Sequence, residues 1–452
     1  MKISIFGTGY VGLVTAACLA EKGHVVVCVD IDSEKVNAIN RGIAPIHEKH
    51  LEEMLQRNLD IRLRATIQGH QAVLESDLSM IAVGTPSDRE GIIDLTQIKE
   101  VSCQIGEALR EKAGYHLVVV KSTVVPGTTD EVVLPTLETM SGKKVGRDFG
   151  LGMNPEFLTE GQAVQDFMTP DRIVIGSVDK RSSAVLEELY ETFPKVPRLK
   201  TNNKTAEMIK YTSNALLATM ISFSNEVANL CTALGDIDAV DVMRAVHLSQ
   251  YLSSSLPNGE SLMPSIVSFL EAGCGFGGSC LPKDVKALRA HGEKAGVPMR
   301  LLDAVLGINE LQPQKLVSFL RKHFPSLQGI RVAILGLAFR PNTDDMRESP
   351  AIPIINQLIA EGADLKAYDP AAKDAARKLF GNGQIVVCDS LSEAIHEVQA
   401  IILITCWDEF KRVPEMLAGI YPQPVFIDGR RMLDKHSIAK YEGIGLSRAI
   451  GE

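Results

Sequence analysis

A cysteine stands in an unusual setting, between glycines and a charged pair. Cys280 lies in the stretch GFGGSCLPKD (275–284), with Lys283 and Asp284 shortly after it. Glycine-rich backbone offers few side chains for a thiol to pack against, so packing explains this cysteine poorly. A lysine nearby and a tight loop favour the thiolate, which is the nucleophilic form. The stretch alone leaves three interpretations: a nucleophile, a metal ligand or a bystander. No cysteine or histidine stands at zinc-ligand spacing from it, which argues against the second.

Two glutamates and a lysine–asparagine pair could work with such a thiol. Glu156 and Glu160 in NPEFLTEG could act as a general base or position a water, or simply be solvated loop residues. Lys210 and Asn214 are four residues apart in EMIKYTSNALLA, so they share one face of a helix with apolar neighbours. A buried ammonium needs a partner. A substrate alkoxide or phosphate oxygen would serve; a glutamate in a structural ion pair is the alternative.

The N-terminal segment has the pattern of a dinucleotide-binding turn. GTGYVG follows an apolar strand and opens a helix, which places Gly7, Gly9 and Gly12 where a pyrophosphate can approach the helix N-terminus. Asp30 ends the second strand, 18 positions beyond Gly12. A carboxylate there accepts the ribose hydroxyls and repels a 2′-phosphate, which favours NAD over NADP.

Two threonines follow later strands of the same region. Thr85 lies in GTPS (84–87) and Thr123 in KSTVVPGT (121–128). Loops past the carboxyl ends of strands line the ligand crevice of an open α/β sheet. We therefore expect both threonines to face cofactor or substrate; helix capping is the alternative for Thr85.

Short apolar strands alternate with amphipathic helices at both ends of the chain, which is typical of parallel sheets covered on both faces. The segment from 202 to 235 instead predicts one long helix with more than one buried side. The fold class is therefore α/β, with two Rossmann-like doubly wound domains joined by a helical middle domain. We predict domains at 1–200, 201–310 and 311–452, and a mobile loop over 249–265.

The second α/β region lacks the glycine fingerprint. In its place stands GLAFRPNTDDMRESP (336–350), with Arg340 and Arg347 before a predicted helix. Guanidinium groups near a helix start suit phosphates. One sheet could thus hold NAD and the other a second phosphorylated ligand.

Composition limits the class of protein. The 452 residues carry a net charge of −9, which argues against a nucleic-acid binder. No apolar run reaches the ~20 residues of a membrane span, and no signal peptide is recognisable. The eight cysteines contain no CxxC pair and, Cys280 apart, fit reduced core thiols, so we expect a cytoplasmic protein.

These motifs together closely resemble the nucleotide-sugar 6-dehydrogenase family, which includes UDP-glucose and GDP-mannose dehydrogenases. The match runs through GTGYVG, VGTPS, KSTVVPGT, NPEFLTEG with PDRIVIG, the Lys210/Asn214 helix, GFGGSCLPKD and FRPNTDDMRESP. The resemblance implies that Cys280 is the nucleophile, and it extends a catalytic role to Thr123, Glu156, Glu160, Lys210, Asn214 and Asp284. It places cofactor contacts on Gly7, Gly9, Tyr10, Val11, Gly12, Asp30, Lys35, Thr85, Thr123, Glu160, Lys283 and Arg347. Nucleotide-sugar contacts would fall on Glu156, Phe157, Leu158, Thr159, Glu160, Lys210, Asn214, Phe269, Leu270, Glu271, Ala272, Gly273, Gly277 and Arg340.

The implied reaction is a four-electron oxidation of a sugar C6 alcohol to the uronate, through a Cys280 thiohemiacetal and thioester. UDP-glucose is the expected substrate, feeding UDP-glucuronate to polysaccharide biosynthesis, followed by GDP-mannose and UDP-N-acetylhexosamines. Two departures weaken the choice of sugar. Arg340 stands where most relatives have lysine, and LMPSIVSFLEAG has no arginine where many UDP-glucose enzymes carry one.

Other classes explain less of the sequence. A 6-phosphogluconate or 2-hydroxyacid-type dehydrogenase would account for the N-terminal region and the lysine–asparagine pair, but not for Cys280 or the C-terminal domain. A non-catalytic nucleotide-sugar binding protein would not need Cys280, Lys210, Asn214 and Asp284 together. We expect no metal, and a homodimer built around the long helix; burial of that helix within one chain is the alternative.

Overall fold

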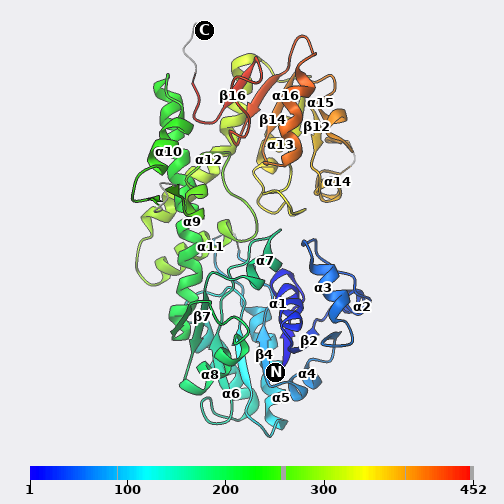
Figure 1. Cartoon of the computed structure of the whole chain (residues 1–452), viewed down its shortest axis with the longest axis vertical. Helices are drawn as coiled ribbons and strands as arrows, with labels where there is room; N and C mark the ends of the chain where they lie inside the picture. The colour runs from blue at the N-terminus through cyan, green and yellow to red at the C-terminus, as the bar shows by residue number, and fades with distance from the viewer. Residues whose placement is uncertain (89, 256–260, 382, 448–452) are drawn as a thin grey trace. The chain divides into compact units, whose positions relative to one another are not determined.

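The computed structural model describes residues 1–88, 90–255, 261–381 and 383–447. It divides into two compact units, Met1–Ser213 and Asn214–Glu452. Each contains a sheet with helices on both faces, as Figure 1 shows. The predicted loop over 249–265 is described only in part, since 256–260 lie outside the described residues.

The first unit is built on an eight-stranded sheet in the order β3-β2-β1-β4-β5-β6-β7-β8. All neighbouring strands are parallel except the pair β6 and β7, which is antiparallel. The predicted parallel sheet is confirmed, with this one antiparallel pair as an addition that was not predicted. The strands are β1 (Lys2–Phe6), β2 (Val25–Val29), β3 (Leu63–Thr66), β4 (Leu78–Ile81), β5 (Leu117–Val120), β6 (Gly150–Met153), β7 (Ile173–Ser177) and β8 (Arg198–Thr201).

Two apolar cores cover the two faces of this sheet, because successive side chains on a strand point to opposite faces. One core packs α1, α2, α3, α7 and α8 against residues such as Ile3 and Ile5. The other packs α4, α5, α6 and the short π-helix η1 against residues such as Phe6 and Val118. The helices are α1 (Tyr10–Glu21), α2 (Ser33–Ile39), α3 (Leu51–Asn58), α4 (Gly69–Glu75), α5 (Thr96–Glu111), η1 (Thr129–Val133), α6 (Leu134–Ser141), α7 (Ala163–Met168) and α8 (Lys180–Leu189).

The predicted long helix is confirmed as α9 (Asn203–Leu234), a single helix of 32 residues. It begins in the first unit and continues into the second. The helical part of the second unit continues with α10 (Ala239–His247), η2 (Ser265–Phe269), α11 (Leu281–Lys294) and α12 (Arg300–His323), and includes a two-stranded ribbon of β9 (Ser254–Ser255) and β10 (Ser261–Leu262).

The second unit also contains a six-stranded parallel sheet in the order β13-β12-β11-β14-β15-β16. Helices α12, α13 and α14 cover one face, and α15 with α16 covers the other. The strands are β11 (Arg331–Leu335), β12 (Asp364–Tyr368), β13 (Val386–Val387), β14 (Ala400–Leu403), β15 (Val425–Asp428) and β16 (Tyr441–Gly443). The helices are α13 (Ala351–Ala360), α14 (Lys373–Phe380), α15 (Leu391–Ile395), η3 (Asp408–Arg412) and α16 (Val413–Leu417). Among the described residues, no helix is both long and apolar enough to span a membrane.

Candidate active site

The glycine turn between β1 and α1 is shaped for close approach of a ligand. A side chain at Gly12 would place its Cβ 1.9 Å from the Gly7 carbonyl oxygen, and Gly7 itself has φ of +96°. Gly9, in contrast, is exposed, and a Cβ there would have no atom within 4 Å. The turn follows β1, which lies beside β4 where the strand order reverses, the place where open α/β sheets bind ligands. Gly7 and Gly12 therefore build the turn, and Gly9 leaves space for a pyrophosphate.

Asp30 closes this crevice at the end of β2. Its carboxylate accepts hydrogen bonds from the Thr8 backbone (2.8 Å) and hydroxyl (2.5 Å) and from the Asp32 backbone (3.0 Å). Burial opposes its ionisation, but these hydrogen bonds outweigh burial and hold the pKa of Asp30 below its ordinary value. The fixed negative charge fits the ribose of NAD and disfavours a 2′-phosphate.

An apolar side chain beside Asp30 was not predicted from the sequence. Ile31 is 100% exposed, which is rare for a large aliphatic side chain unless a ligand or partner covers it. Lys35, the third residue of α2, is half-buried, and its backbone N–H donates to Asp32. The sequence alone could have pointed to Ile31, because this isoleucine directly follows the acidic residue at the end of the second strand. The residues present therefore fit a dinucleotide.

The two predicted threonines lie in adjacent loops. The Thr85 hydroxyl donates to the Thr123 carbonyl oxygen (2.8 Å), so it joins the loops after β4 and β5 rather than capping a helix. The Ser122 hydroxyl adds a second link to the Val83 carbonyl (2.7 Å). These bonds fix the Thr123 backbone at the carboxyl end of β5.

A buried charge cluster surrounds the first predicted glutamate. Glu156 and Lys210 form an ion pair at 2.9 Å, with side chains only 5% and 4% exposed. The buried ammonium of Lys210 therefore has a glutamate partner in this structure. Burial raises the pKa of Glu156, but Lys210, the Leu158 N–H and Lys121 lower it further, and the net shift is downward. Glu156 is therefore held as a carboxylate.

Lys121 belongs to this cluster and was not predicted from the sequence. It directly precedes the KST serine, is buried, and donates to the Asn154 side chain (3.0 Å). Burial lowers its pKa to about 8, with Lys210 adding to the shift and Glu156 opposing it. The sequence could have pointed to Lys121, because it is a lysine directly after an otherwise apolar strand.

The rest of the 156–160 loop is anchored through its backbone. The Leu158 N–H donates to Glu156 (2.6 Å) and the Thr159 N–H to Asp166 (2.8 Å). The Phe157 ring lies under the Arg172 guanidinium (3.9 Å) and within 5.6 Å of the Lys210 ammonium. Glu160 at the end of this loop is half-buried.

The loop end is also linked to the cofactor turn. The Tyr10 hydroxyl, on the first residue of α1, donates to Glu48, and the Gly161 N–H donates to both Tyr10 (2.7 Å) and Glu48 (2.8 Å). Val11, next to Tyr10, is half-buried. The glycine turn and the loop ending at Glu160 are therefore held together.

Cys280 occupies the N-terminal cap position of α11 in the second unit. The helix dipole is positive at this end and favours the negative charge of a thiolate. The Ser279 hydroxyl lies 3.6 Å from the Cys280 sulfur. Unlike most other cysteines of the chain, Cys280 is half-buried rather than fully buried.

Asp284 lies one turn after Cys280 and organises the other polar groups. Its backbone N–H donates to the Cys280 carbonyl (2.9 Å). Its carboxylate, fully buried, accepts from the Asn214 amide (2.6 Å) and from the Lys283 ammonium (2.7 Å). The second unit thus places the Asn214 amide and the Lys283 ammonium on the carboxylate of Asp284, one helical turn after Cys280.

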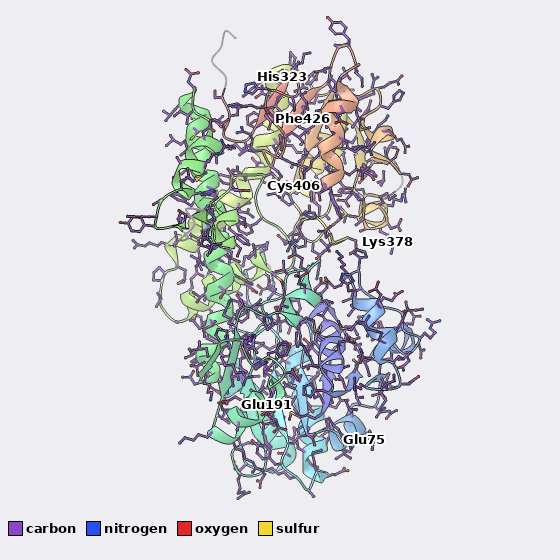
Figure 2. All side chains as sticks on the ribbon, in the orientation of Figure 1. Glu75, Glu191, His323, Lys378, Cys406 and Phe426 are labelled. Atoms are coloured by element: carbon purple, nitrogen blue, oxygen red, sulfur yellow. The ribbon has the colours of Figure 1, made fainter. Side chains whose placement is uncertain are left out.

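Several of the other thiols are poorly suited to be nucleophiles. Burial raises the pKa of Cys18 and of Cys28 to about 12, and that of Cys406, labelled in Figure 2, to about 11. Such thiols are almost wholly protonated near neutral pH. None of the eight cysteines, all of which are described, is in a disulfide.

The glycine loop before Cys280 packs against the arginine loop of the C-terminal sheet. The Gly278 N–H donates to the Arg347 carbonyl (2.9 Å), and a Cβ at Gly277 would lie 2.2 Å from the Glu348 carbonyl oxygen. The Arg347 side chain is exposed and paired with Asp345 (2.7 Å). Arg340 is half-buried in the same loop.

Within the segment 269–273, two residues line a cavity of about 260 Å³, to whose wall α10 contributes more residues than any other element. Glu271 and Ala272 are at its wall, together with Arg430 and Arg431, which follow β15. Arg430 also touches Gly273, where a Cβ would lie 3.0 Å from its guanidinium. Phe269 ends η2, and Leu270 is buried. Arg430 was not predicted from the sequence, although two arginines directly after a buried strand were visible in VFIDGRR.

The second sheet has its own carboxylate at the position that Asp30 holds in the first. Asp369 follows β12 and is fully buried. It accepts from the backbone of Leu337 (2.8 Å) and Ala338 (3.0 Å) and from the indole of Trp407 (3.1 Å). The Asp369 carboxylate is fully buried and hydrogen-bonded to protein groups, whereas Asp30 is half-buried. Asp369 is therefore not accessible to the ribose of a ligand in the way that Asp30 is.

Among the residues that the structure describes, no three His, Cys, Asp or Glu side chains gather as a metal site would require. The first unit brings together the cofactor turn, the threonine loops and the Glu156–Lys210 pair. The second brings together the Cys280 cluster and, separately, the cavity beside Arg430.

Three family models match the chain. They are the UDP-glucose/GDP-mannose dehydrogenase family NAD binding domain (1–194), its central domain (204–311) and its UDP binding domain (333–435). The first identifies NAD as the cofactor.

Relatives and solved structures agree over nearly the whole chain. UDP-glucose 6-dehydrogenase AglM of Haloferax volcanii is 42% identical over 98% of this chain and 100% of its own. GDP-mannose 6-dehydrogenase of Pseudomonas syringae pv. syringae is 44% identical over 96% of this chain and 95% of its own. A UDP-glucose dehydrogenase structure from Pyrobaculum islandicum has a TM-score of 0.89 at 37% identity, covering 98% of both chains. The chain therefore belongs to the UDP-glucose/GDP-mannose dehydrogenase family of NAD-dependent nucleotide-sugar 6-dehydrogenases.

Proposed function

We propose that this protein oxidises the C6 alcohol of UDP-glucose to the carboxylate of UDP-glucuronate, with Cys280 as the covalent nucleophile. The observation that carries the proposal is the position of Cys280 at the N-terminus of α11, beside the Asp284–Asn214–Lys283 cluster. A thiol at a helix N-terminus with a lysine nearby is placed to react as the thiolate.

The chemistry explains why a thiol is required. The alcohol first loses a proton and a hydride to become an aldehyde, which is itself a poor hydride donor. The Cys280 thiolate adds to the aldehyde carbon, forming a C–S bond and an oxyanion. That oxyanion expels the second hydride and becomes a thioester. Water then adds to the thioester, the C–S bond breaks, and the carboxylate and the thiol are released.

The other residues stabilise charge and move protons. Lys210 and Asn214 are assigned to the developing oxyanions. Proton transfer and water positioning are assigned to Glu160, Thr123 and Asp284, while Glu156 fixes Lys210. Bound NAD supplies the hydride acceptor, one molecule for each of the two oxidations.

The remaining assignments concern binding. NAD would be held by the glycine turn together with Tyr10, Val11, Asp30, Lys35, Thr85, Thr123 and Glu160, with Lys283 and Arg347 contributing to its phosphates. The backbone of 156–160, the segment 269–273, Gly277 and Arg340 would hold the nucleotide sugar. The cavity lined by Glu271 and Ala272 supports the second assignment and adds Arg430 to it.

The choice of UDP-glucose is tested directly with a panel of nucleotide sugars. Named relatives include both UDP-glucose and GDP-mannose enzymes at similar identity. UDP-glucose, GDP-mannose and UDP-N-acetylhexosamines should be compared by the rate of NADH formation. We expect kcat/KM to be highest for UDP-glucose; a much higher value for GDP-mannose would reverse the substrate assignment while leaving the reaction type in place.

The role of Cys280 is tested by replacing it with alanine. Wild-type protein should release two NADH per sugar and no free aldehyde. The Cys280→Ala protein should bind NAD and substrate but form almost no uronate, because the group that makes the aldehyde a hydride donor is gone. Cys103→Ala, which removes another half-buried thiol, is the matched control and should behave as wild type. Uronate formation near the wild-type rate in Cys280→Ala would show that the aldehyde is oxidised as its hydrate.

We also propose a homodimer in which a second copy covers α9. Leu216, Phe223 and Leu230 are 51%, 52% and 57% exposed, and their spacing of seven puts them on one stripe of the helix. Phe223→Asp should therefore shift the sedimentation coefficient from dimer towards monomer. A wild-type protein that sediments as a monomer would contradict this.

A further inference from the structure

Glu207 is a fully buried carboxylate on α9 to which the proposed mechanism gives no task. It accepts three hydrogen bonds, all from one short segment. The Gly127 N–H donates to Oε2 (2.6 Å), and the Thr129 N–H (2.8 Å) and hydroxyl (2.6 Å) donate to Oε1. A buried charge is retained at such a position only when several donors satisfy it.

The segment that Glu207 holds is the far end of the loop carrying Thr123. The near end is fixed by the bond between the Thr85 hydroxyl and the Thr123 carbonyl. At the far end, Gly127 has φ of +100°, and the π-helix η1 begins at Thr129. The loop is therefore anchored at both ends, and Glu207 supplies the far anchor.

Glu207 also lies three residues before Lys210 on the same helix, so the two side chains leave neighbouring positions of one helix face. Lys210 reaches Glu156, and Glu207 reaches the 127–129 backbone. One helical turn of α9 is thereby attached to both loops that carry proposed catalytic residues of the first unit.

We propose that Glu207 is a positioning residue that fixes the Thr123 loop against the turn of α9 bearing Lys210. This inference rests on the proposed function for the catalytic roles of Thr123 and Lys210. Glu207 is not a catalytic residue, because both of its oxygens are occupied by protein donors and its side chain is buried.

The anchor requires the ionised form. Glutamine would keep one acceptor oxygen, but its NH₂ group would face an N–H donor and leave that donor unsatisfied. Burial raises the pKa of Glu207 to about 7, while the Thr129 and Gly127 bonds oppose this rise. Charged groups lie on both packed elements: Asp130 and Glu131 on η1, and Lys204 on α9.

The test compares Glu207→Gln with Glu131→Gln. Glu131 pairs with Lys204 (2.9 Å) across the same two elements, but on the exposed surface, so it is a matched control. The measurements are kcat and KM for the nucleotide sugar, NAD binding by calorimetry, and amide hydrogen exchange of peptides covering 122–133.

For Glu207→Gln we expect kcat to fall at least about tenfold, because small misplacements of catalytic groups are costly. NAD affinity should fall much less than kcat, since the glycine turn is untouched and, of the expected cofactor contacts, only Thr123 lies on the loosened loop. Amide hydrogen exchange in the segment 122–133 should become faster. The change of kcat with pH that the titration of Glu207 near neutral pH causes in the wild type should be absent from the variant. The Glu131→Gln control should change none of these.

Thr129→Val provides a milder variant in case Glu207→Gln does not fold, because it removes only the hydroxyl bond. The proposal is overturned if Glu207→Gln, or Thr129→Val in its place, keeps both wild-type kcat and wild-type exchange in 122–133. A wild-type protein that forms no NADH with any nucleotide sugar would instead refute the proposed function; the exchange comparison would then still decide whether Glu207 anchors the loop.

Discussion

Replacing Lys210 by methionine breaks a buried ion pair whose energy can be worked out from its geometry. At 2.9 Å and an effective dielectric constant of about 20, the attraction between Lys210 and Glu156 is about 6 kcal/mol. Desolvation of the two groups offsets much of this. Removing one partner, however, leaves the Glu156 carboxylate buried with only the Leu158 N–H and Lys121 to compensate it, which costs about 3–5 kcal/mol. We expect a loss of that size in the free energy of unfolding.

The pH dependence gives the sharper test. In the wild type the pKa of Glu156 is depressed, so its contribution is present above the unfolded pKa and is lost as the pH falls. Without Lys210, burial dominates and the pKa of Glu156 rises, so the variant gains stability relative to wild type as the pH falls. Glu156→Gln should show the opposite trend. Removing the Glu156 charge lowers the pKa of Lys121 further from about 8. The loss of stability of Glu156→Gln relative to wild type should therefore become smaller as the pH rises.

The assay is urea unfolding followed by far-UV circular dichroism across about pH 5–9, for both single variants and the double variant. The double variant should be less destabilised than the sum of the singles by about 2–3 kcal/mol. Lys204→Met, which breaks an exposed pair on the same helix, should leave the midpoint nearly unchanged. The reasoning fails if Lys210→Met resembles this control, or if both single variants have the same pH slope.

Two further outcomes are expected. Gly12→Ala should abolish NAD binding in calorimetry and lower the unfolding midpoint, because its Cβ would lie 1.9 Å from the Gly7 carbonyl oxygen. Gly9→Ala should weaken NAD binding but leave the unfolding midpoint unchanged, since a Cβ there has no atom within 4 Å. Equal unfolding midpoints for the two variants would contradict this reasoning. Burial lowers the pKa of His116 to about 3, so between about pH 6.5 and 3 this histidine is protonated in the unfolded chain but neutral in the folded protein. The free energy of unfolding should therefore fall as the pH drops through this range. In His116→Asn the urea unfolding midpoint should depend less on pH in this range. A pH dependence equal to that of wild type would contradict the role given to His116.

Local patterns predicted much of the fold because strands and helices leave short-range signals. The strands that begin both sheets and the helix α9 lie where the apolar patterns placed them. β8 was missed because RLKT is half-exposed and carries no apolar run. The antiparallel pairing of β6 with β7 was missed because direction depends on how the intervening chain returns, which a strand's own residues do not encode.

The candidate site was predictable as a set of residues but not as a set of partners. Chemistry pointed to Lys210 as a buried cation and left its partner open between a substrate and a glutamate; Glu156 lies 54 positions earlier and becomes its neighbour only through the fold. Arg430 and Lys121 were missed for the same reason, since each follows a strand in a way that is informative only once the neighbouring loop is known. Thr85 was assigned to a crevice, and its hydrogen bond to Thr123 depends on the adjacency of β4 and β5.

The Trp407–Asp369 hydrogen bond gives this protein a built-in optical probe. The chain contains one tryptophan, so all indole fluorescence comes from a single place, the loop after β14 at the carboxyl end of the second sheet. Phe426, labelled in Figure 2, lies on the adjacent β15 and does not contribute to that emission. Spectral changes during a titration with a ligand that does not absorb in the near UV would therefore report events in the C-terminal domain without a chemical label.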